Sequence, residues 1–182
     1  MVALEILLVG VLLAWVGLGL LTVWGLTGTR ILKPGQPAEL PSPAPRISIL
    51  VAARDEEEAL PAALESLLAL DYSEYDVILV DDDSTDRTGA IADEWAKRPA
   101  SAGRLKVIHN HELPPGWRGK VHALSLAANA ATGEWLLSTD ADVVFHPALL
   151  GLAVSCALKE QARLVSLLPE FELSSQFQNI GT

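Results

Sequence analysis

The 182 residues of the chain are half hydrophobic, and 23 acidic against 13 basic side chains give a formal net charge of −10. This composition argues against a disordered tail, a fibrous repeat and a nucleic-acid partner, because nucleic acid is bound through clustered Lys and Arg. The single cysteine, Cys156, excludes an intramolecular disulfide and a cysteine-based zinc cluster.

The first segment is an N-terminal apolar stretch. No charged residue lies between Ile6 and Leu26, and about twenty apolar residues are what a helix needs to cross the hydrocarbon core of a membrane. A cleaved signal peptide is the alternative. Such a peptide has a basic start and a shorter apolar core, whereas Glu5 is the only charged residue before this stretch. We therefore predict a transmembrane anchor over residues 1–28.

The segment that follows the apolar stretch carries positive charge and proline. Arg30, Lys33 and Arg46 come after the stretch and no Lys or Arg comes before it, so the positive-inside rule places the rest of the chain on the cytoplasmic side. Prolines are frequent over residues 34–45, and we predict a stiff, extended linker over residues 29–45. The remaining residues, 46–182, suit one compact domain.

Beyond the linker, short apolar runs alternate with segments of helical spacing. The apolar runs predict strands over residues 47–53, 76–80, 105–109, 134–139 and 163–168. Helices are predicted between them, over residues 57–70, from about 84 to 97, over 121–131 and over 147–161. Ser84, Thr85 or Asp86 can cap the second helix, and Pro147 opens the last one. The alternation predicts an α/β fold, a mainly parallel sheet with helices on both faces.

Polar clusters follow three of the predicted strands. Residues 54–56 follow the first strand, residues 81–83 the second and residues 140–142 the fourth. In parallel sheets, ligands bind in the crevice beyond the carboxyl ends of the strands. We therefore expect the three acidic clusters to converge at one edge of the sheet.

The third of these clusters has the form Asp-x-Asp. Side chains of one or both of Asp140 and Asp142 can reach a single cation, and diphosphate oxygens can complete the shell of Mg²⁺ or Mn²⁺. A metal in that position acts as a Lewis acid that stabilises a departing nucleoside diphosphate. Taken alone, an Asp-x-Asp pair is more often a solvated turn, so the pair needs its context to decide between the two interpretations.

The other charged candidates also have two interpretations. Carboxylates over residues 81–83 favour the dipole of the helix that follows, but one of them can instead accept hydrogen bonds from a base or a ribose. Lys120 opposes the dipole at a helix start unless an anion binds there, and a solvated lysine is the alternative. Residues 116–121 do not fit the Walker pattern. No Gly-x-Gly-x-x-Gly follows any predicted strand, which argues against a dinucleotide oxidoreductase.

In this order, the segments resemble glycosyltransferase family 2, whose nucleotide-binding domain has the GT-A fold. The resemblance covers about residues 46–168. It rests on four motifs: Val51-Ala52-Ala53-Arg54-Asp55-Glu56-Glu57, Val80-Asp81-Asp82-Asp83-Ser84-Thr85-Asp86-Arg87-Thr88, Gly119-Lys120-Val121-His122-Ala123-Leu124 and Thr139-Asp140-Ala141-Asp142. Residues 113–120 are similar to a membrane-bound subgroup that includes hopene-associated and ceramide-type glucosyltransferases.

The resemblance implies a substrate, a cofactor and a set of site residues. It implies a nucleotide-diphosphate sugar donor, Mg²⁺ or Mn²⁺, and inverting transfer of a hexose to a hydroxyl group, expected on a membrane lipid. The implied donor-binding residues are Ala53, Arg54, Asp55, Glu56, Asp81, Asp82, Lys120 and Asp140. The implied metal ligands are Asp140 and Asp142.

The resemblance also implies a general base that deprotonates the acceptor hydroxyl. In the family this acidic residue lies well after the Asp-x-Asp, followed by a Gln-x-x-Arg-Trp-type motif, and neither is evident before Thr182. We assign no catalytic residue and expect a C-terminally truncated fragment or a donor-binding remnant. A catalytically incomplete, membrane-tethered binding module is one alternative. A nucleotidyltransferase is another, although its Arg/Lys-rich glycine loop after the first strand is absent.

Overall fold

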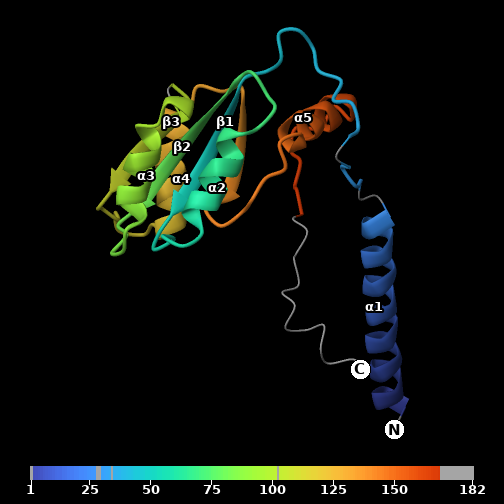
Figure 1. The fold of residues 1–182 in the computed structure, drawn as a ribbon. Helices are drawn as coiled ribbons and strands as arrows, with labels where there is room; N and C mark the ends of the chain where they lie inside the picture. Colours follow the sequence, from blue (N-terminus) through green and yellow to red (C-terminus); the bar gives the residue numbers. More distant parts are fainter. Residues whose placement is uncertain (1, 28–29, 34, 102, 169–182) are drawn as a thin grey trace, which may run out of the picture. The chain divides into compact units, whose positions relative to one another are not determined.

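The computed structural model describes residues 2–27, 30–33, 35–101 and 103–168, which fall into two units, Met1–Lys33 and Pro34–Thr182. The first unit contains one helix, α1 (Val2–Thr27), drawn in blue in Figure 1. Its segment Leu7–Gly25 has a mean hydropathy of 2.3 and is, by length and composition, able to cross a membrane. This matches the predicted apolar helix.

The second unit is built around a four-stranded, wholly parallel sheet with the strand order β3-β2-β1-β4 (Figure 1). The strands are β1 (Ile47–Ala53), β2 (Tyr75–Asp82), β3 (Leu105–Asn110) and β4 (Trp135–Asp140). Register pairs Ala53 with Asp81 and Ala52 with Asp140. The strands therefore end together, so that the polar segments behind β1, β2 and β4 leave the sheet at one edge.

Helices pack on both faces of this sheet, as predicted. Alternate residues of β1 and β2 point to opposite faces. One set packs with α2 (Leu60–Leu68), α3 (Thr88–Ala96) and α5 (Leu149–Lys159), and the other set packs with α4 (Gly119–Ala130). A short 3₁₀ helix, η1 (Pro99–Ser101), precedes β3. The continuous apolar strands arise from this burial on two faces.

The predicted fifth strand is wrong. Residues 163–168 form no strand, and Leu164 and Leu168 are 87% and 79% exposed. An apolar run becomes a strand only where a neighbouring strand pairs with its backbone. Residues 163–168 have no such strand within the described part of the chain.

All four helix starts of the second unit also differ from the predictions, and α4 begins at Gly119 rather than residue 121. α5 begins at Leu149, so Pro147 precedes the helix, and its carbonyl accepts a hydrogen bond from the Asp71 N–H at 2.9 Å. α2 begins at Leu60 rather than residue 57, because the preceding backbone is bound to the loop after β2. α3 has Arg87 at its N-cap without a side-chain cap, although Asp86 accepts a hydrogen bond from the Thr88 N–H at 2.8 Å.

Candidate functional site

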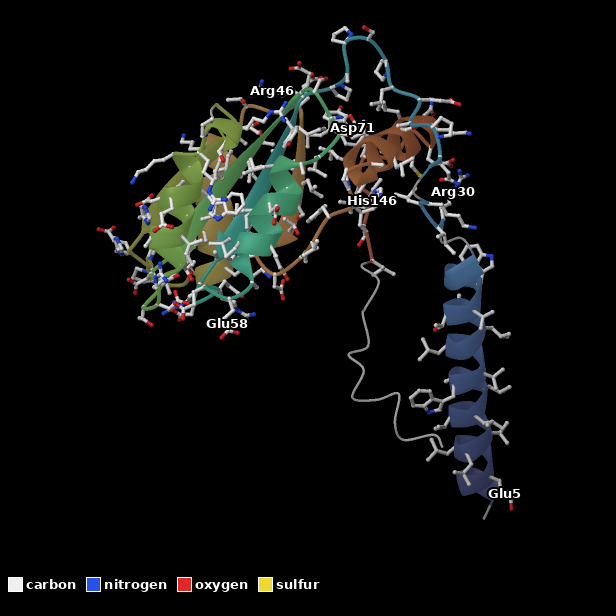
Figure 2. The ribbon with its side chains drawn as sticks, viewed as in Figure 1. Glu5, Arg30, Arg46, Glu58, Asp71 and His146 are labelled. Atoms are coloured by element: carbon white, nitrogen blue, oxygen red, sulfur yellow. The ribbon has the colours of Figure 1, made fainter. Side chains whose placement is uncertain are left out.

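A pocket of about 350 Å³ opens where β1 and β4 end and α4 begins. In Figure 2, the labelled Arg46 and Glu58 mark the two ends of β1, and the pocket lies toward the Glu58 end. The lining residues are Ala52, Ala53, Arg54, Glu56, Asp82, Gly119, Lys120, Asp140, Ala141 and Asp142. The structure thus brings together most of the site residues that the sequence indicates, and leaves Asp55 and Asp81 outside the lining.

Lys120 and Asp140 form an ion pair inside this pocket. Lys120 Nζ lies 2.5 Å from Asp140 Oδ1, and both side chains are more than half exposed. An exposed pair of this kind adds only about 0–1 kcal/mol to stability. Lys120 is the second residue of α4, where the helix dipole disfavours a cation. The carboxylate of Asp140 offsets that cost, and the pair places one charge of each sign at the start of α4.

The carboxylates of the Asp-x-Asp motif are candidate ligands for a cation in this pocket. Asp140 and Asp142 both line the pocket, and Asp142 is exposed. Within the described residues, no group of three or more His, Cys, Asp and Glu side chains is arranged to hold a metal ion. Two carboxylates fit a Mg²⁺ or Mn²⁺ ion that takes its remaining oxygens from phosphates and water. The donor set thus suits a metal that binds together with a phosphorylated ligand.

Asp82, the last residue of β2, is held between β3 and α4. The side-chain amide of Asn110 donates a hydrogen bond to Asp82 Oδ1 at 2.7 Å. On the other side, a Cβ added to Gly119 would lie 2.6 Å from Asp82 Oδ2. Glycine is therefore required at the first position of α4 for the carboxylate to keep its place in the pocket lining.

Asp81 points to the opposite face of the sheet from Asp82, because successive side chains of a strand alternate. Its Oδ2 lies 3.0 Å from His109 Nδ1, and its Oδ1 accepts a hydrogen bond from the Ser84 N–H at 3.4 Å. His109 also contacts Asp93, with Nε2 and Oδ1 3.1 Å apart. The hydrogen bonds with Asp81 and then with Asp93 raise the pKa of His109. Asp81 therefore supports the loop and β3 from outside the pocket.

Asp55 links two loops and is not among the residues that line the pocket. Its Oδ1 accepts hydrogen bonds from the Thr85 N–H at 2.7 Å and the Thr85 hydroxyl at 3.1 Å, and its own N–H donates to Ser84 Oγ at 3.1 Å. The backbone of Asp55 has a φ of +54°. Aspartate is one of the residue types that occupies this left-handed region most readily.

His109 and Asn110 are polar residues of the site region that sequence reasoning missed. They are the last two residues of β3, and register pairs them with Asp81 and Asp82. The sequence signal for them is that the third apolar run ends in two polar residues, as β2 ends in two aspartates. This signal indicates a contact only when β3 is known to lie next to β2.

Comparison with known proteins gives a family match and a set of relatives. Residues 48–172 match the family model described as Glycosyl transferase family 2. The chain is 35% identical over 130 residues to a beta-monoglucosyldiacylglycerol synthase from Nostoc sp. (strain PCC 7120), covering 69% of this chain and 27% of that protein. It is 31% identical over 137 residues to a 4,4'-diaponeurosporenoate glycosyltransferase from Staphylococcus haemolyticus, covering 74% and 35%. It thus spans about a quarter to a third of these relatives.

Solved structures share the same architecture. A mannosyltransferase from Pyrobaculum calidifontis in complex with GDP-Man and Mn²⁺ matches with a TM-score of 0.57 and 30% identity, covering 68% of this chain and 36% of that one. S. aureus TarS 1-349 in complex with UDP-GlcNAc matches with a TM-score of 0.54 and 26% identity, covering 64% and 32%. These likenesses confirm the predicted GT-A-like sheet.

Proposed function

The chain belongs to glycosyl transferase family 2, and on this premise we propose that its pocket binds a nucleotide-diphosphate sugar together with Mg²⁺ or Mn²⁺. The observation that carries the proposal is the placement of Lys120, Asp140 and Asp142 at one pocket wall beside the start of α4. This wall offers a cation to phosphate oxygens and carboxylates to a divalent metal. Both can compensate for the negative charge of a bound diphosphate.

The charged wall is suited to receive a diphosphate. The first turn of α4 presents free backbone N–H groups, and Lys120 adds a full positive charge at the same place. Asp140 and Asp142 are the residues that would hold the metal, which would supply stabilisation of the negative charge on a leaving nucleoside diphosphate. Lys120, now paired with Asp140, would then be available to contact the phosphates.

The inner wall of the pocket is suited to receive the nucleoside. Asp82 lies there as a hydrogen-bond acceptor for a base N–H or a ribose hydroxyl, with Ala53, Arg54 and Glu56 beside it. Asp55 and Asp81 take supporting roles in this arrangement, since their carboxylates are engaged by Thr85 and by His109. The proposed donor-binding residues are therefore those of the predicted set that line the pocket.

We further propose that the acceptor is a hydroxyl group of a membrane lipid. Two observations support this: α1 is long and apolar enough to span a membrane, and one relative is named for the synthesis of a glucosylated diacylglycerol. In this proposal residues 1–28 form the anchor, 29–45 the linker and 46–182 part of the glycosyltransferase domain. Arg30, Lys33 and Arg46, which follow the anchor, support an orientation with that domain on the cytoplasmic side.

Calorimetric titration tests the donor site. The full chain in detergent is titrated with UDP-glucose, UDP-GlcNAc and GDP-mannose, with Mn²⁺ or with EDTA. We expect one donor to bind only with metal, and Asp142→Ala to weaken its binding about tenfold or more, as loss of a charged ligand does. Glu94→Ala removes the same charge from the exposed surface of α3 and serves as the matched control.

Two results would contradict the proposal in different ways. Binding that survives both EDTA and Asp142→Ala would remove the metal from the proposed site. A wild-type chain that binds none of the three nucleotide sugars, while folded, would remove the donor site itself.

A further inference from the structure

Two buried polar side chains meet where β2 and β3 end. Asp82 is 6% exposed and Asn110 is 8% exposed, and register places them side by side on neighbouring strands. Asn110 Nδ2 donates to Asp82 Oδ1 at 2.7 Å, a short distance that is typical of a hydrogen bond to a charged acceptor. A buried carboxylate without such a donor is costly, so this contact compensates for the burial of the Asp82 side chain.

The contact also fixes the direction in which Asp82 presents its second oxygen. An ionised carboxylate has about four acceptor positions on its two oxygens. Asn110 occupies a position on Oδ1, and Oδ2 lies near the start of α4, where a Cβ added to Gly119 would come within 2.6 Å of it. Asp82 also lines the pocket, so a ligand in the pocket would meet the acceptor positions that Asn110 leaves open.

We propose that Asn110 is a positioning residue for nucleoside recognition, which acts by holding Asp82 in the orientation that accepts a hydrogen bond from the ligand. The inference deepens the proposed function and rests on it. Asn110 itself is not among the residues that line the pocket, so its effect on binding passes through Asp82. The pocket then recognises a ligand edge that carries an N–H or O–H donor, and it disfavours an edge with acceptors only.

Two substitutions at position 110 separate positioning from a general role in folding. Asn110→Leu keeps a similar volume but cannot donate a hydrogen bond. We expect it to weaken donor binding about tenfold at every pH, since a hydrogen bond to a charged group is lost. Asn110→Asp keeps the shape but places two carboxylates together, and such a pair holds one shared proton at a pH where isolated aspartates have lost theirs.

The shared proton provides the decisive readout. At about pH 8 the Asn110→Asp variant should bind as weakly as Asn110→Leu, because the two carboxylates repel. At about pH 5 the shared proton supplies an O–H donor to Asp82, and we expect binding to return to within about threefold of the wild type at that pH. The Asn110→Leu variant cannot supply such a donor, so its binding should stay weak at both pH values. A purely structural role for Asn110 does not predict this difference between the two variants.

The other ionisable groups near the site are the same in all the proteins that are compared. Glu56, Asp140 and Asp142 in the pocket and His109 on β3 are present in the wild type and in every variant. Each Asn110 variant is therefore compared with the wild type at the same pH, by calorimetry with the donor and Mn²⁺. Asn129→Asp makes the identical exchange on the exposed surface of α4 and should bind like the wild type at both values.

The possible outcomes are distinct. Recovery at low pH in Asn110→Asp alone supports the inference. Wild-type affinity in Asn110→Leu, or an Asn110→Asp variant as weak as Asn110→Leu at both pH values, overturns it and leaves the donor site intact. A wild-type chain that binds no nucleotide sugar overturns the proposed function, and the inference with it.

Discussion

At the scale of single residues, His109 is held between two carboxylates. Nδ1 lies 3.0 Å from Asp81 and Nε2 lies 3.1 Å from Asp93, so the protonated ring can donate to both. The hydrogen bond with Asp81, followed by that with Asp93, raises the pKa of His109 above its ordinary value of 6.5. A raised pKa stabilises the fold fully below the ordinary value, and this contribution is lost as the pH rises through the raised value.

We therefore expect the His109→Gln variant to lose a pH dependence that the wild type has. In the wild type, the free energy of unfolding should fall, relative to the variant, as the pH rises from about 6 to 8. Urea unfolding of the full chain in detergent across this range measures the difference. His111→Gln is the matched control, because the His111–Asp83 pair is well exposed and adds little. Parallel curves for the wild type and His109→Gln would contradict the prediction.

At the scale of elements, the loop after β1 and the loop after β2 are joined by hydrogen bonds in both directions. Backbone N–H groups of one loop donate to side chains of the other, as in Glu56 to Thr88 at 2.7 Å and Arg87 to Glu57 at 3.0 Å. Asp55 and Thr85 form the central contact. The pocket residue Glu56 is thus held in place through its backbone N–H by the segment that starts α3.

Thr88→Val tests this junction with almost no change of shape. Thr88 is fully buried, and its hydroxyl accepts the Glu56 N–H, so the substitution leaves a buried donor unpaired at a cost of about 1–3 kcal/mol. Thr85→Val is the comparison, because the Thr85 backbone keeps its bond to Asp55 and only a hydroxyl bond worth about 0.5–1.5 kcal/mol is lost. Denaturant unfolding measures both. An equal loss of unfolding free energy in the two variants would argue against a special role for the Thr88–Glu56 hydrogen bond in joining the loops.

Elements also differ in how far the sequence predicts them. The two central strands, β1 and β2, are predicted because burial on two faces imposes continuous apolar runs, as in residues 47–53. The edge strands β3 and β4 are partly exposed, and their shorter apolar runs are still long enough to predict them. Residues 163–168 are also mainly apolar but have no neighbouring strand among the described residues, so composition alone misleads there. The opposite directions of Asp81 and Asp82 follow from strand alternation once β2 is known to extend to Asp82. The contacts of Asp55, His109 and Asn110 depend on which strands and loops are neighbours, and local sequence does not encode that.

At the scale of the whole molecule, the charges and the apolar surface are unevenly distributed along the chain. In α1, Glu5 is the only charged residue, and large side chains such as Leu12 and Trp15 are exposed, Trp15 by 68%. In water such a helix would leave its apolar surface unburied, at a cost of about 25 cal/mol for each Å². A lipid bilayer removes that cost, and the segment Leu7–Gly25 has the length to span one.

A charge placed in the middle of α1 tests whether the helix spans the bilayer. Leu13→Arg should cost about 2.5–3.5 kcal/mol of insertion free energy at the centre of a spanning helix. We expect the fraction of the chain that resists alkaline carbonate extraction from membranes to fall at least several-fold. Leu164→Arg makes the same exchange at an exposed site of the second unit and should leave the fraction unchanged. Carbonate treatment strips proteins that merely lie on the surface, so undiminished resistance in Leu13→Arg would mean that α1 is not the element that holds this chain in the membrane.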